Sequence, residues 1–122
     1  MPTFSSFDGT ELFYDDQGDG RAVVLLHGFA ADTNINWVRS GILDRLVDEG
    51  FRTLALDLRG HGLSAKPHDP AAYADDALTR DVQALLDHLR LEAVAVVGFS
   101  MGSGIALRLG AIEPRVRAVV AL

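Results

Sequence analysis

Ser100 lies between two glycines in the sequence Gly98-Phe99-Ser100-Met101-Gly102, and this spacing is typical of a serine nucleophile. The motif follows a run of β-branched residues and precedes a predicted helix, so it would form a tight turn that lifts the hydroxyl above a sheet. A side chain in place of either glycine would collide with backbone in such a turn. The N-terminus of the following helix would favour the negative charge that develops during attack. Ser100 is therefore the candidate nucleophile, and the alternative is a turn in which its side chain only caps the helix.

A second motif, His27-Gly28-Phe29, directly follows the first strongly apolar strand. When a serine attacks an acyl group, two backbone N–H groups stabilise the oxyanion, one from this loop and one from the residue after the serine. The predicted donors are Phe29 and Met101. Gly28 would let the loop backbone come close, while His27 is better explained as a structural histidine whose ring bonds to loop backbone.

The elements that must position these residues alternate between strand and helix after an N-terminal hairpin. Asp8-Gly9 is a hairpin turn signal between residues 3–5 and 10–14, and a second glycine turn follows at 18–20. Apolar runs predict strands at 22–26, 51–56, 93–97 and 116–122, and apolar residues at helical spacing predict helices at 37–48, 78–89 and 100–111, the second with Asp75 or Asp76 near its N-cap. Repeated crossovers of this kind give an α/β fold: a three-layer α/β/α arrangement with an open, mainly parallel sheet.

The composition is that of an ordinary globular protein, with 48% apolar and 23% charged residues. A formal net charge of −6, with no run of Lys and Arg, argues against nucleic acid as a partner. Because the chain has no cysteine, disulfides, thiol nucleophiles and thiolate metal sites are excluded. Neither a dinucleotide-binding nor a phosphate-loop glycine motif follows any predicted strand, and we expect no cofactor and no metal.

Neither a secretion signal nor a membrane span is predicted. The N-terminus has no basic stretch followed by an apolar run. The longest uncharged stretch, residues 93–107, is interrupted by glycines and is short for a membrane span. We expect a cytoplasmic protein without a membrane partner.

A third motif runs from Asp57 to Gly62 as Asp-Leu-Arg-Gly-His-Gly, with Ser64 soon after. Here the sequence resembles the α/β-hydrolase superfamily. His-Gly after the third strand, Asp-x-Arg-Gly-x-Gly-x-Ser after the fourth and Gly-x-Ser-x-Gly after the fifth match it in order and spacing, from Ala22 to Leu122.

The resemblance implies a serine hydrolase that acts on an ester-like or other acyl substrate, with a nucleophile elbow at Ser100. It also implies structural roles in the third motif, where Asp57 would tie down loop backbone and Arg59 would pair with a carboxylate. Dehalogenases and epoxide hydrolases share this layout but resemble a version with aspartate at the elbow, so a serine points away from both.

The acid and the histidine base of the family's triad have no counterpart after the serine. Only Glu113 is a carboxylate between Ser100 and Leu122, and no histidine occurs there. We therefore expect residues 1–122 to form one partial domain that ends at about the sixth strand, without the lid and without the C-terminal triad residues. His27 and His61 are conceivable substitute bases because both follow the carboxyl ends of strands.

A second hypothesis from a different class is a non-catalytic half-domain or fragment that serves binding or self-assembly. The missing histidine favours it, whereas the intact elbow favours a hydrolase. In either case residues 116–122 would form an open sheet edge guarded only by Arg117, and such edges pair with other chains. We therefore expect a small-molecule acyl substrate and a homodimer formed through this edge.

Overall fold

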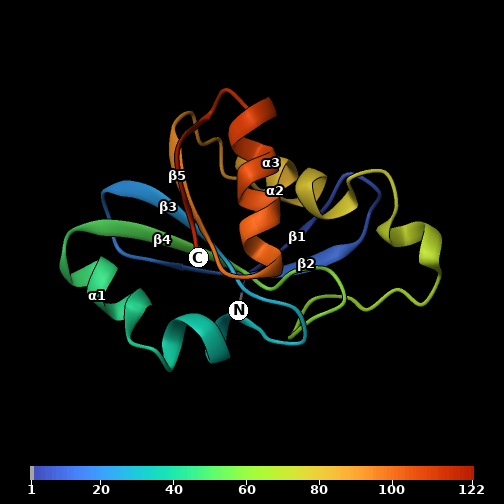
Figure 1. Ribbon diagram of the computed structural model, residues 1–122, viewed down its shortest axis with the longest axis horizontal. Helices are drawn as coiled ribbons and strands as arrows, with labels where there is room; N and C mark the ends of the chain where they lie inside the picture. The colour runs from blue at the N-terminus through green and yellow to red at the C-terminus, as the bar shows by residue number, and fades with distance from the viewer. Residues whose placement is uncertain (1) are drawn as a thin grey trace.

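A mainly parallel sheet runs through the computed structural model, which describes residues 2–122 (Figure 1). Within these residues the sheet has six strands, in the order β1-β2-β4-β3-β5-β6. The strands are β1 (Thr3–Ser5), β2 (Glu11–Gln17), β3 (Arg21–Leu26), β4 (Phe51–Leu56), β5 (Val94–Gly98) and β6 (Val116–Ala121). The last four are mutually parallel, while β1 and β2 are antiparallel additions, β2 pairing with β4. The predicted α/β architecture is therefore confirmed.

Helices cover both faces of the sheet. Helices α2 (Ala77–His88) and α3 (Met101–Ile112) lie on one face, and α1 (Ile42–Asp48) lies on the other (Figure 1). Two shorter pieces complete the chain, a π-helical turn at Asn34–Val38 and a 3₁₀ turn at Pro70–Tyr73. No helix among the described residues is long and apolar enough to cross a membrane.

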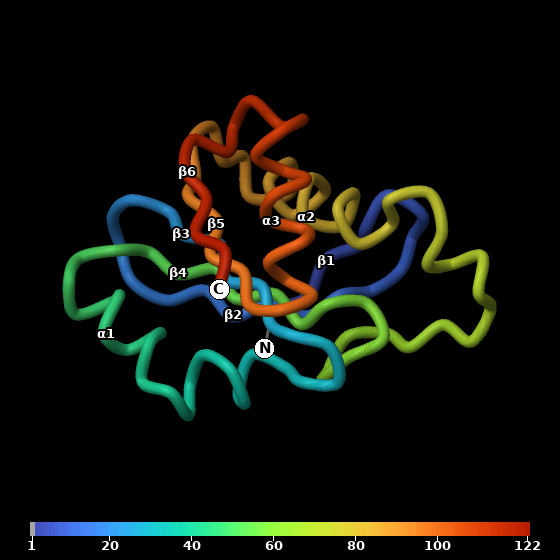
Figure 2. Tube along the Cα trace, viewed as in Figure 1, coloured from blue at the N-terminus to red at the C-terminus, as the bar shows by residue number. Residues whose placement is uncertain are grey.

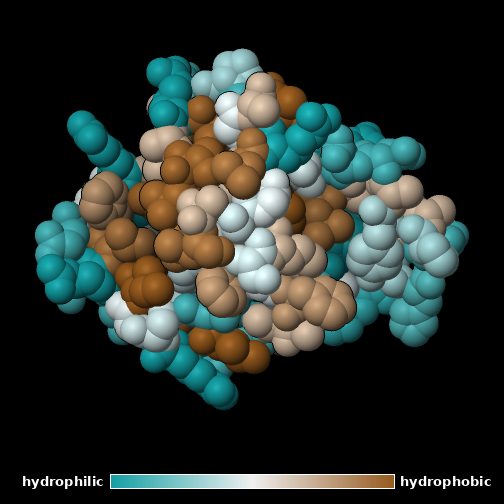
Figure 3. All heavy atoms as spheres, viewed as in Figure 1, coloured by the Kyte–Doolittle hydropathy of each residue, from teal (hydrophilic) through white to brown (hydrophobic). Residues whose placement is uncertain are grey.

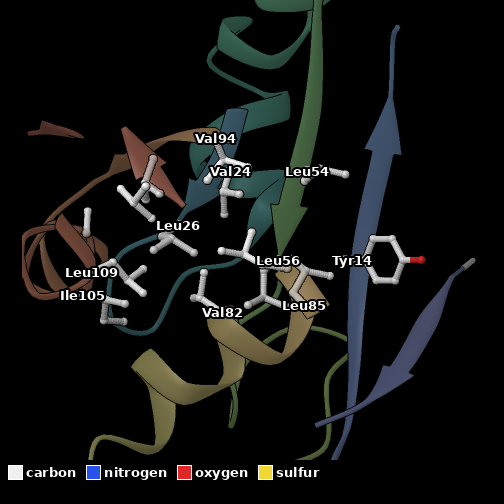
Figure 4. Close-up of a cluster of buried hydrophobic side chains, with 14 of the residues drawn as sticks. Tyr14, Val24, Leu26, Leu54, Leu56, Val82, Leu85, Val94, Ile105 and Leu109 are labelled. Atoms are coloured by element: carbon white, nitrogen blue, oxygen red, sulfur yellow. The ribbon is translucent and has the colours of Figure 1, made fainter. Parts of the chain in front are cut away.

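The buried core has two parts because side chains of a strand alternate between the faces of a sheet. In β3, Val24 and Leu26 point toward α2 and α3, whereas Val23 and Leu25 point toward α1. Figure 4 shows the larger part, where side chains from the strands meet those of α2 and α3. Its labelled members include Leu54, Leu56, Val82, Leu85, Ile105 and Leu109. This packing fixes the parallel strands beneath the loops at their carboxyl ends.

The prediction of one continuous helix over residues 37–48 is wrong. The chain instead forms the π-helical turn, breaks at Gly41 with φ +81°, and begins α1 at Ile42. The Ser40 hydroxyl bonds to the backbone oxygen of Asn36 at 2.7 Å, which competes with a regular helical ladder. Trp37 and Leu43 are buried in this arrangement, whereas Ile42 is 37% exposed.

The N-cap of α2 is Asp76, one of the two predicted residues, but its side chain caps no backbone N–H. Its backbone is left-handed, with φ +59°. The carboxylate instead pairs with Arg108 of α3 at 3.0 Å. The acidic residue therefore links the two helices that cover one face of the sheet.

Because β3, β4 and β5 are parallel, the loops that follow them emerge at one edge of the sheet. The tube in Figure 2 traces these three loops near the centre of the molecule, close to the end of β6. They carry the three sequence motifs, so the topology alone brings His27, Asp57 and Ser100 to the same edge.

Candidate active site

Ser100 occupies a sharp turn between β5 and α3 with φ +53° and ψ −114°. A non-glycine residue with this backbone conformation is strained, and such strain is concentrated at functional sites. Its side chain is exposed and makes no cap hydrogen bond to α3. The alternative in which Ser100 serves only as a helix cap is therefore wrong.

Two glycines make the turn possible. A Cβ atom added at Gly98 would lie 2.1 Å from the backbone oxygen of Gly102, and one added at Gly102 would lie 2.1 Å from that of Leu26. Both distances are far below van der Waals contact, and the atoms met are backbone. Packing therefore requires glycine at both positions, at Gly98 because the first turn of α3 lies against it and at Gly102 because α3 lies against the end of β3.

Backbone hydrogen bonds hold the turn to strands on both sides. The N–H of Phe99 donates to the oxygen of Leu26 at 3.0 Å, which joins the turn to β3. On the other side, the N–H of Ser100 donates to the oxygen of Leu122 at 3.0 Å, and the N–H of Leu122 donates to the oxygen of Gly98 at 2.9 Å. The position of the hydroxyl is thus set by the sheet itself.

The loop after β3 lies directly against Ser100. A Cβ atom added at Gly28 would lie 3.4 Å from the Ser100 Cβ and 3.1 Å from the Phe99 ring. Gly28 therefore allows the close approach that the sequence predicted. This contact brings the backbone of Gly28 next to the Ser100 side chain.

Two backbone donors beside the serine have no hydrogen-bond partner within residues 2–122. They are the N–H groups of Phe29 and Met101, the predicted oxyanion donors. Their neighbours are paired: Gly28 N–H donates to Asn36 Oδ1 at 2.8 Å, and Ala30 N–H donates to His61 Nε2 at 3.1 Å. Both N–H groups are therefore available to a ligand.

His27 is fully buried, with both ring nitrogens bonded to loop backbone. Leu58 N–H donates to Nε2 at 2.9 Å, so Nδ1 carries the proton and donates to the oxygen of Gly28 at 2.8 Å. Burial lowers the pKa of His27, which keeps the ring neutral. This is the arrangement expected of a structural histidine that joins the loops after β3 and β4.

His61 is likewise engaged at both nitrogens. Nε2 accepts from Ala30 N–H at 3.1 Å, and Nδ1 donates to the backbone oxygen of Arg59 at 3.0 Å. Neither His27 nor His61 therefore offers a free nitrogen for the proton of Ser100. The suggestion that one of them substitutes for the base is not supported by this geometry.

Glu113, the carboxylate nearest in sequence after the serine, follows the C-terminal end of α3, the opposite end from Ser100. It accepts hydrogen bonds from the Arg115 guanidinium at 2.9 Å and from Gln83 at 3.2 Å. These bonds, with those from Arg115 first, lower the pKa of Glu113 to about 2. Glu113 is therefore a structural carboxylate and has no access to the serine.

Asp57 is buried and ties down two loops, the role that the resemblance implied. Its Oδ1 accepts from Thr33 N–H at 2.9 Å, and its Oδ2 accepts from Leu63 N–H at 3.0 Å. Ser64 closes the same loop by donating to the backbone oxygen of Asp57 and accepting from Phe13 N–H. Both acceptor atoms of the carboxylate are thus committed to backbone.

Arg59 is fully buried and pairs with two carboxylates. It forms two hydrogen bonds to Asp81 of α2, at 3.0 and 2.7 Å, and two to Asp8 of the hairpin turn, at 2.7 and 3.0 Å. The guanidinium holds the pKa of Asp8 well below its usual range. The predicted ion pair is present, and it fastens the N-terminal hairpin to the loop after β4.

Asn36 is a residue of this region to which the sequence analysis gave no role. Its side-chain oxygen accepts the Gly28 N–H across eight positions of the chain. No motif marks it, because the loop brings it under Gly28 only through the π-helical turn that the sequence analysis missed.

Comparison with known proteins agrees with this fold. Residues 21–122 match the family model described as the alpha/beta hydrolase fold. The chain therefore belongs to the α/β-hydrolase family.

Named relatives have diverse activities. A non-heme haloperoxidase of Rhodococcus erythropolis is 40% identical over 107 residues, which cover 85% of this chain and 36% of that protein. An epoxide hydrolase of Caballeronia sordidicola is 34% identical over 116 residues, which cover 94% of this chain and 34% of that protein. The chain thus spans about a third of the length of these relatives.

Solved structures give the same picture. An esterase from Exiguobacterium antarcticum matches with a TM-score of 0.80 and 33% identity, covering 95% of this chain and 41% of that one. A bottromycin epimerase, solved with bottromycin A2, matches with a TM-score of 0.88 and 36% identity, covering 97% of this chain and 46% of that one. The shared half therefore occurs in proteins named for different reactions.

Proposed function

We propose that Ser100 is the nucleophile of a serine hydrolase that acts on an ester or a similar acyl compound. The observation that carries the proposal is the strained turn at Ser100, φ +53° and ψ −114°, with an exposed and uncapped hydroxyl. Strain of this kind persists only where the surrounding structure imposes it, as the two glycines and the three backbone hydrogen bonds do here.

In the proposed reaction, Ser100 Oγ attacks the carbonyl carbon while its proton passes to a base. The carbonyl oxygen becomes an oxyanion, and the N–H groups of Phe29 and Met101 would donate to it. The positive end of α3 adds to this stabilisation. Collapse of the tetrahedral intermediate releases the alcohol, which takes the proton, and leaves an acyl-serine that water hydrolyses.

None of the candidate bases and acids considered within residues 2–122 is free to act on Ser100. The rings of His27 and His61 are fully engaged, and Glu113 is bonded to Arg115. Loss of triad residues lowers the rate of a serine hydrolase by about a million-fold, and the oxyanion hole and binding still give roughly a thousand-fold or more over water. We therefore expect weak esterase-like activity, or none, from these 122 residues alone.

The relatives include epoxide hydrolases, but the proposal does not extend to epoxide opening. The resemblance described above assigns an aspartate elbow to epoxide hydrolases, and this chain carries Ser100 at that position. A serine alkoxide attacking an acyl carbon gives an ester intermediate that water can cleave. Acyl transfer is therefore the reaction that the elbow residue supports.

The first test is covalent labelling of the serine. The 122-residue chain, Ser100→Ala and the matched control Ser103→Ala are treated with a p-nitrophenyl alkylphosphonate, whose phosphorus is attacked by an activated serine with release of p-nitrophenol. Because these residues supply no base, labelling is expected to be slow and is followed over hours. The original chain and Ser103→Ala are expected to gain a phosphonyl group on the peptide that contains Ser100 faster than the background set by Ser100→Ala, which is expected to gain none there. Equal labelling of all three, or labelling of another residue, would count against the proposal.

A second candidate is a non-catalytic half-domain used for binding or self-assembly. The observation that favours it is the absence of a free histidine nitrogen beside Ser100 within residues 2–122. A chain that stays unlabelled, and whose ester hydrolysis equals that of Ser100→Ala, would favour this candidate over the hydrolase.

A further inference from the structure

Three consecutive backbone N–H groups in the loop after β3 differ in their hydrogen-bond partners. Gly28 N–H donates to Asn36 Oδ1 at 2.8 Å, and Ala30 N–H donates to His61 Nε2 at 3.1 Å. Phe29 N–H, between them, has no partner within residues 2–122. Two side-chain acceptors therefore occupy the outer donors and leave the middle one available.

Ala30 adopts a left-handed backbone conformation with φ +56°. This conformation is unfavourable for alanine, so neighbouring contacts must hold it. One is the backbone hydrogen bond from Ala31 N–H to the oxygen of Gly28 at 3.3 Å, which closes the turn. Another is the hydrogen bond that Ala30 N–H donates to His61 Nε2, a side chain from the loop after β4. It keeps the peptide on the C-terminal side of Phe29 turned toward the loop after β4.

His61 is itself held in one orientation. Its Nδ1 donates to the backbone oxygen of Arg59 at 3.0 Å, which leaves Nε2 unprotonated and able to accept. The Arg59 side chain is locked between Asp8 and Asp81, so this anchor is rigid. The ring also meets the Phe29 ring edge to face, with centroids 5.8 Å apart.

We propose that His61 is a positioning residue for the oxyanion donor of Phe29. By accepting from Ala30 N–H and packing against the Phe29 ring, it fixes the loop so that the Phe29 N–H is the free donor beside Ser100. The use of that donor rests on the proposed function, whereas the order that His61 imposes on the loop does not. His61 is assigned no proton transfer, because both of its nitrogens are occupied.

The decisive variants are His61→Gln and His61→Asn, which differ by one methylene. The glutamine oxygen reaches the position of Nε2 and can accept from Ala30 N–H, whereas the asparagine side chain reaches only the position of Nδ1. His61→Phe is a third variant that keeps a ring against Phe29 but has no acceptor. The partly exposed position of residue 61 suits all three substitutions.

The first readout is amide hydrogen exchange followed by NMR. The Ala30 amide is expected to be protected in the original chain and in His61→Gln, and to exchange at least about tenfold faster in His61→Asn and His61→Phe. Amides of β3 should stay protected in all four proteins, which shows that the sheet is intact. Unchanged protection of Ala30 in both His61→Asn and His61→Phe would overturn the proposal.

The second readout is the rate of phosphonylation of Ser100. Removing an oxyanion donor lowers catalysis by about 100- to 1,000-fold, and a misplaced donor should lower the labelling rate by at least about tenfold. The expected order is the original chain and His61→Gln above His61→Asn and His61→Phe. Equal labelling rates with altered Ala30 exchange would overturn the positioning role. A complete lack of labelling in the original chain would count against the proposed function instead, while amide exchange still decides whether His61 orders the loop.

Discussion

Single side chains around Ser100 act chiefly as hydrogen-bond acceptors for loop backbone. Asp57 accepts from two N–H groups, and Asn36, His27 and His61 accept from one each. Each of these hydrogen bonds occupies a backbone N–H group that a ligand could otherwise use. Backbone N–H groups are rarely left unpaired when buried. At the scale of the residue, the free donor of Phe29 is therefore defined by the side chains that occupy its neighbours, whereas the N–H groups on either side of Met101 donate to the backbone oxygens of Leu122 and Phe99.

Glu113 gives a residue-scale prediction about acid stability. Its pKa is lowered to about 2, so the stabilisation that it provides is complete above the ordinary pKa of 4.5 and is lost as the pH falls toward 2. Glu113→Gln should lower the free energy of unfolding by about 1–3 kcal/mol near neutral pH, since Arg115 loses one of its two charged partners and keeps only Asp87. Urea unfolding at several pH values measures this.

The difference between the two proteins should shrink as the pH falls from about 5 to about 2.5, because the Glu113 carboxyl takes up a proton in the unfolded chain over this range while the folded chain holds it ionised until the pH nears 2. Taking the difference cancels the other carboxylates that titrate there. A gap that stays constant over this pH range would show that the ionised Glu113 contributes nothing to stability.

Helix α3 shows how an element combines local preference with close packing. It begins at the strained serine and runs over the end of β3, where Gly102 meets the backbone oxygens of Leu26 and His27. A Cβ atom added at Gly104, by contrast, would meet nothing within 4 Å. Packing therefore requires glycine at position 102 but not at position 104.

Gly102 and Gly104 of α3 form a matched pair for mutation. Gly102→Ala should destabilise the fold by about 2–4 kcal/mol, because its Cβ would lie 2.1 Å from the oxygen of Leu26 and α3 would have to move. Gly104→Ala should stabilise it by up to about 1 kcal/mol, since alanine favours the helix and has open space. Thermal and urea unfolding measure both. Similar effects of the two substitutions would mean that α3 does not pack on β3 as described.

At the scale of the whole molecule, the loops that carry the motifs lie together at the carboxyl ends of the parallel strands. Strand β6 is the outermost strand on one side of the sheet. Within residues 2–122, β6 pairs with β5 on one side and has no strand on the other. Large apolar side chains near it are exposed, including Val120 at 47% and Leu122 at 59%. Figure 3 shows hydrophobic residues gathered on the face where the C-terminus lies.

We expect a protein consisting of these 122 residues to self-associate through β6, because an open, apolar strand edge pairs readily with a second copy. Light scattering over a range of concentrations should give a mass above that of one chain. Val120→Lys, which adds a charge on this edge strand, should shift the equilibrium toward the monomer. A strict monomer at high concentration would contradict the expectation.

Local sequence signals determined the succession of strands and helices along the chain and the N-terminal hairpin. They also determined the turn at Ser100 with its two required glycines. These features depend on periodicity and turn chemistry over a few neighbouring residues, which a sequence displays directly. The resemblance carried by three motifs gave the family and the roles of Asp57 and Arg59.

Only the tertiary structure decided which side chain accepts from which backbone group. It paired His61 with Ala30 and Asn36 with Gly28, interrupted the predicted helix at Gly41, and removed His27 and His61 as candidate bases. Such partners come from different loops, and their meeting depends on how β3, β4 and β5 align in the sheet. A hydrogen bond between distant segments produces no periodic pattern in the sequence. The resemblance could therefore name the N–H groups of Phe29 and Met101, but only the tertiary structure shows that they are free while their neighbours are bonded.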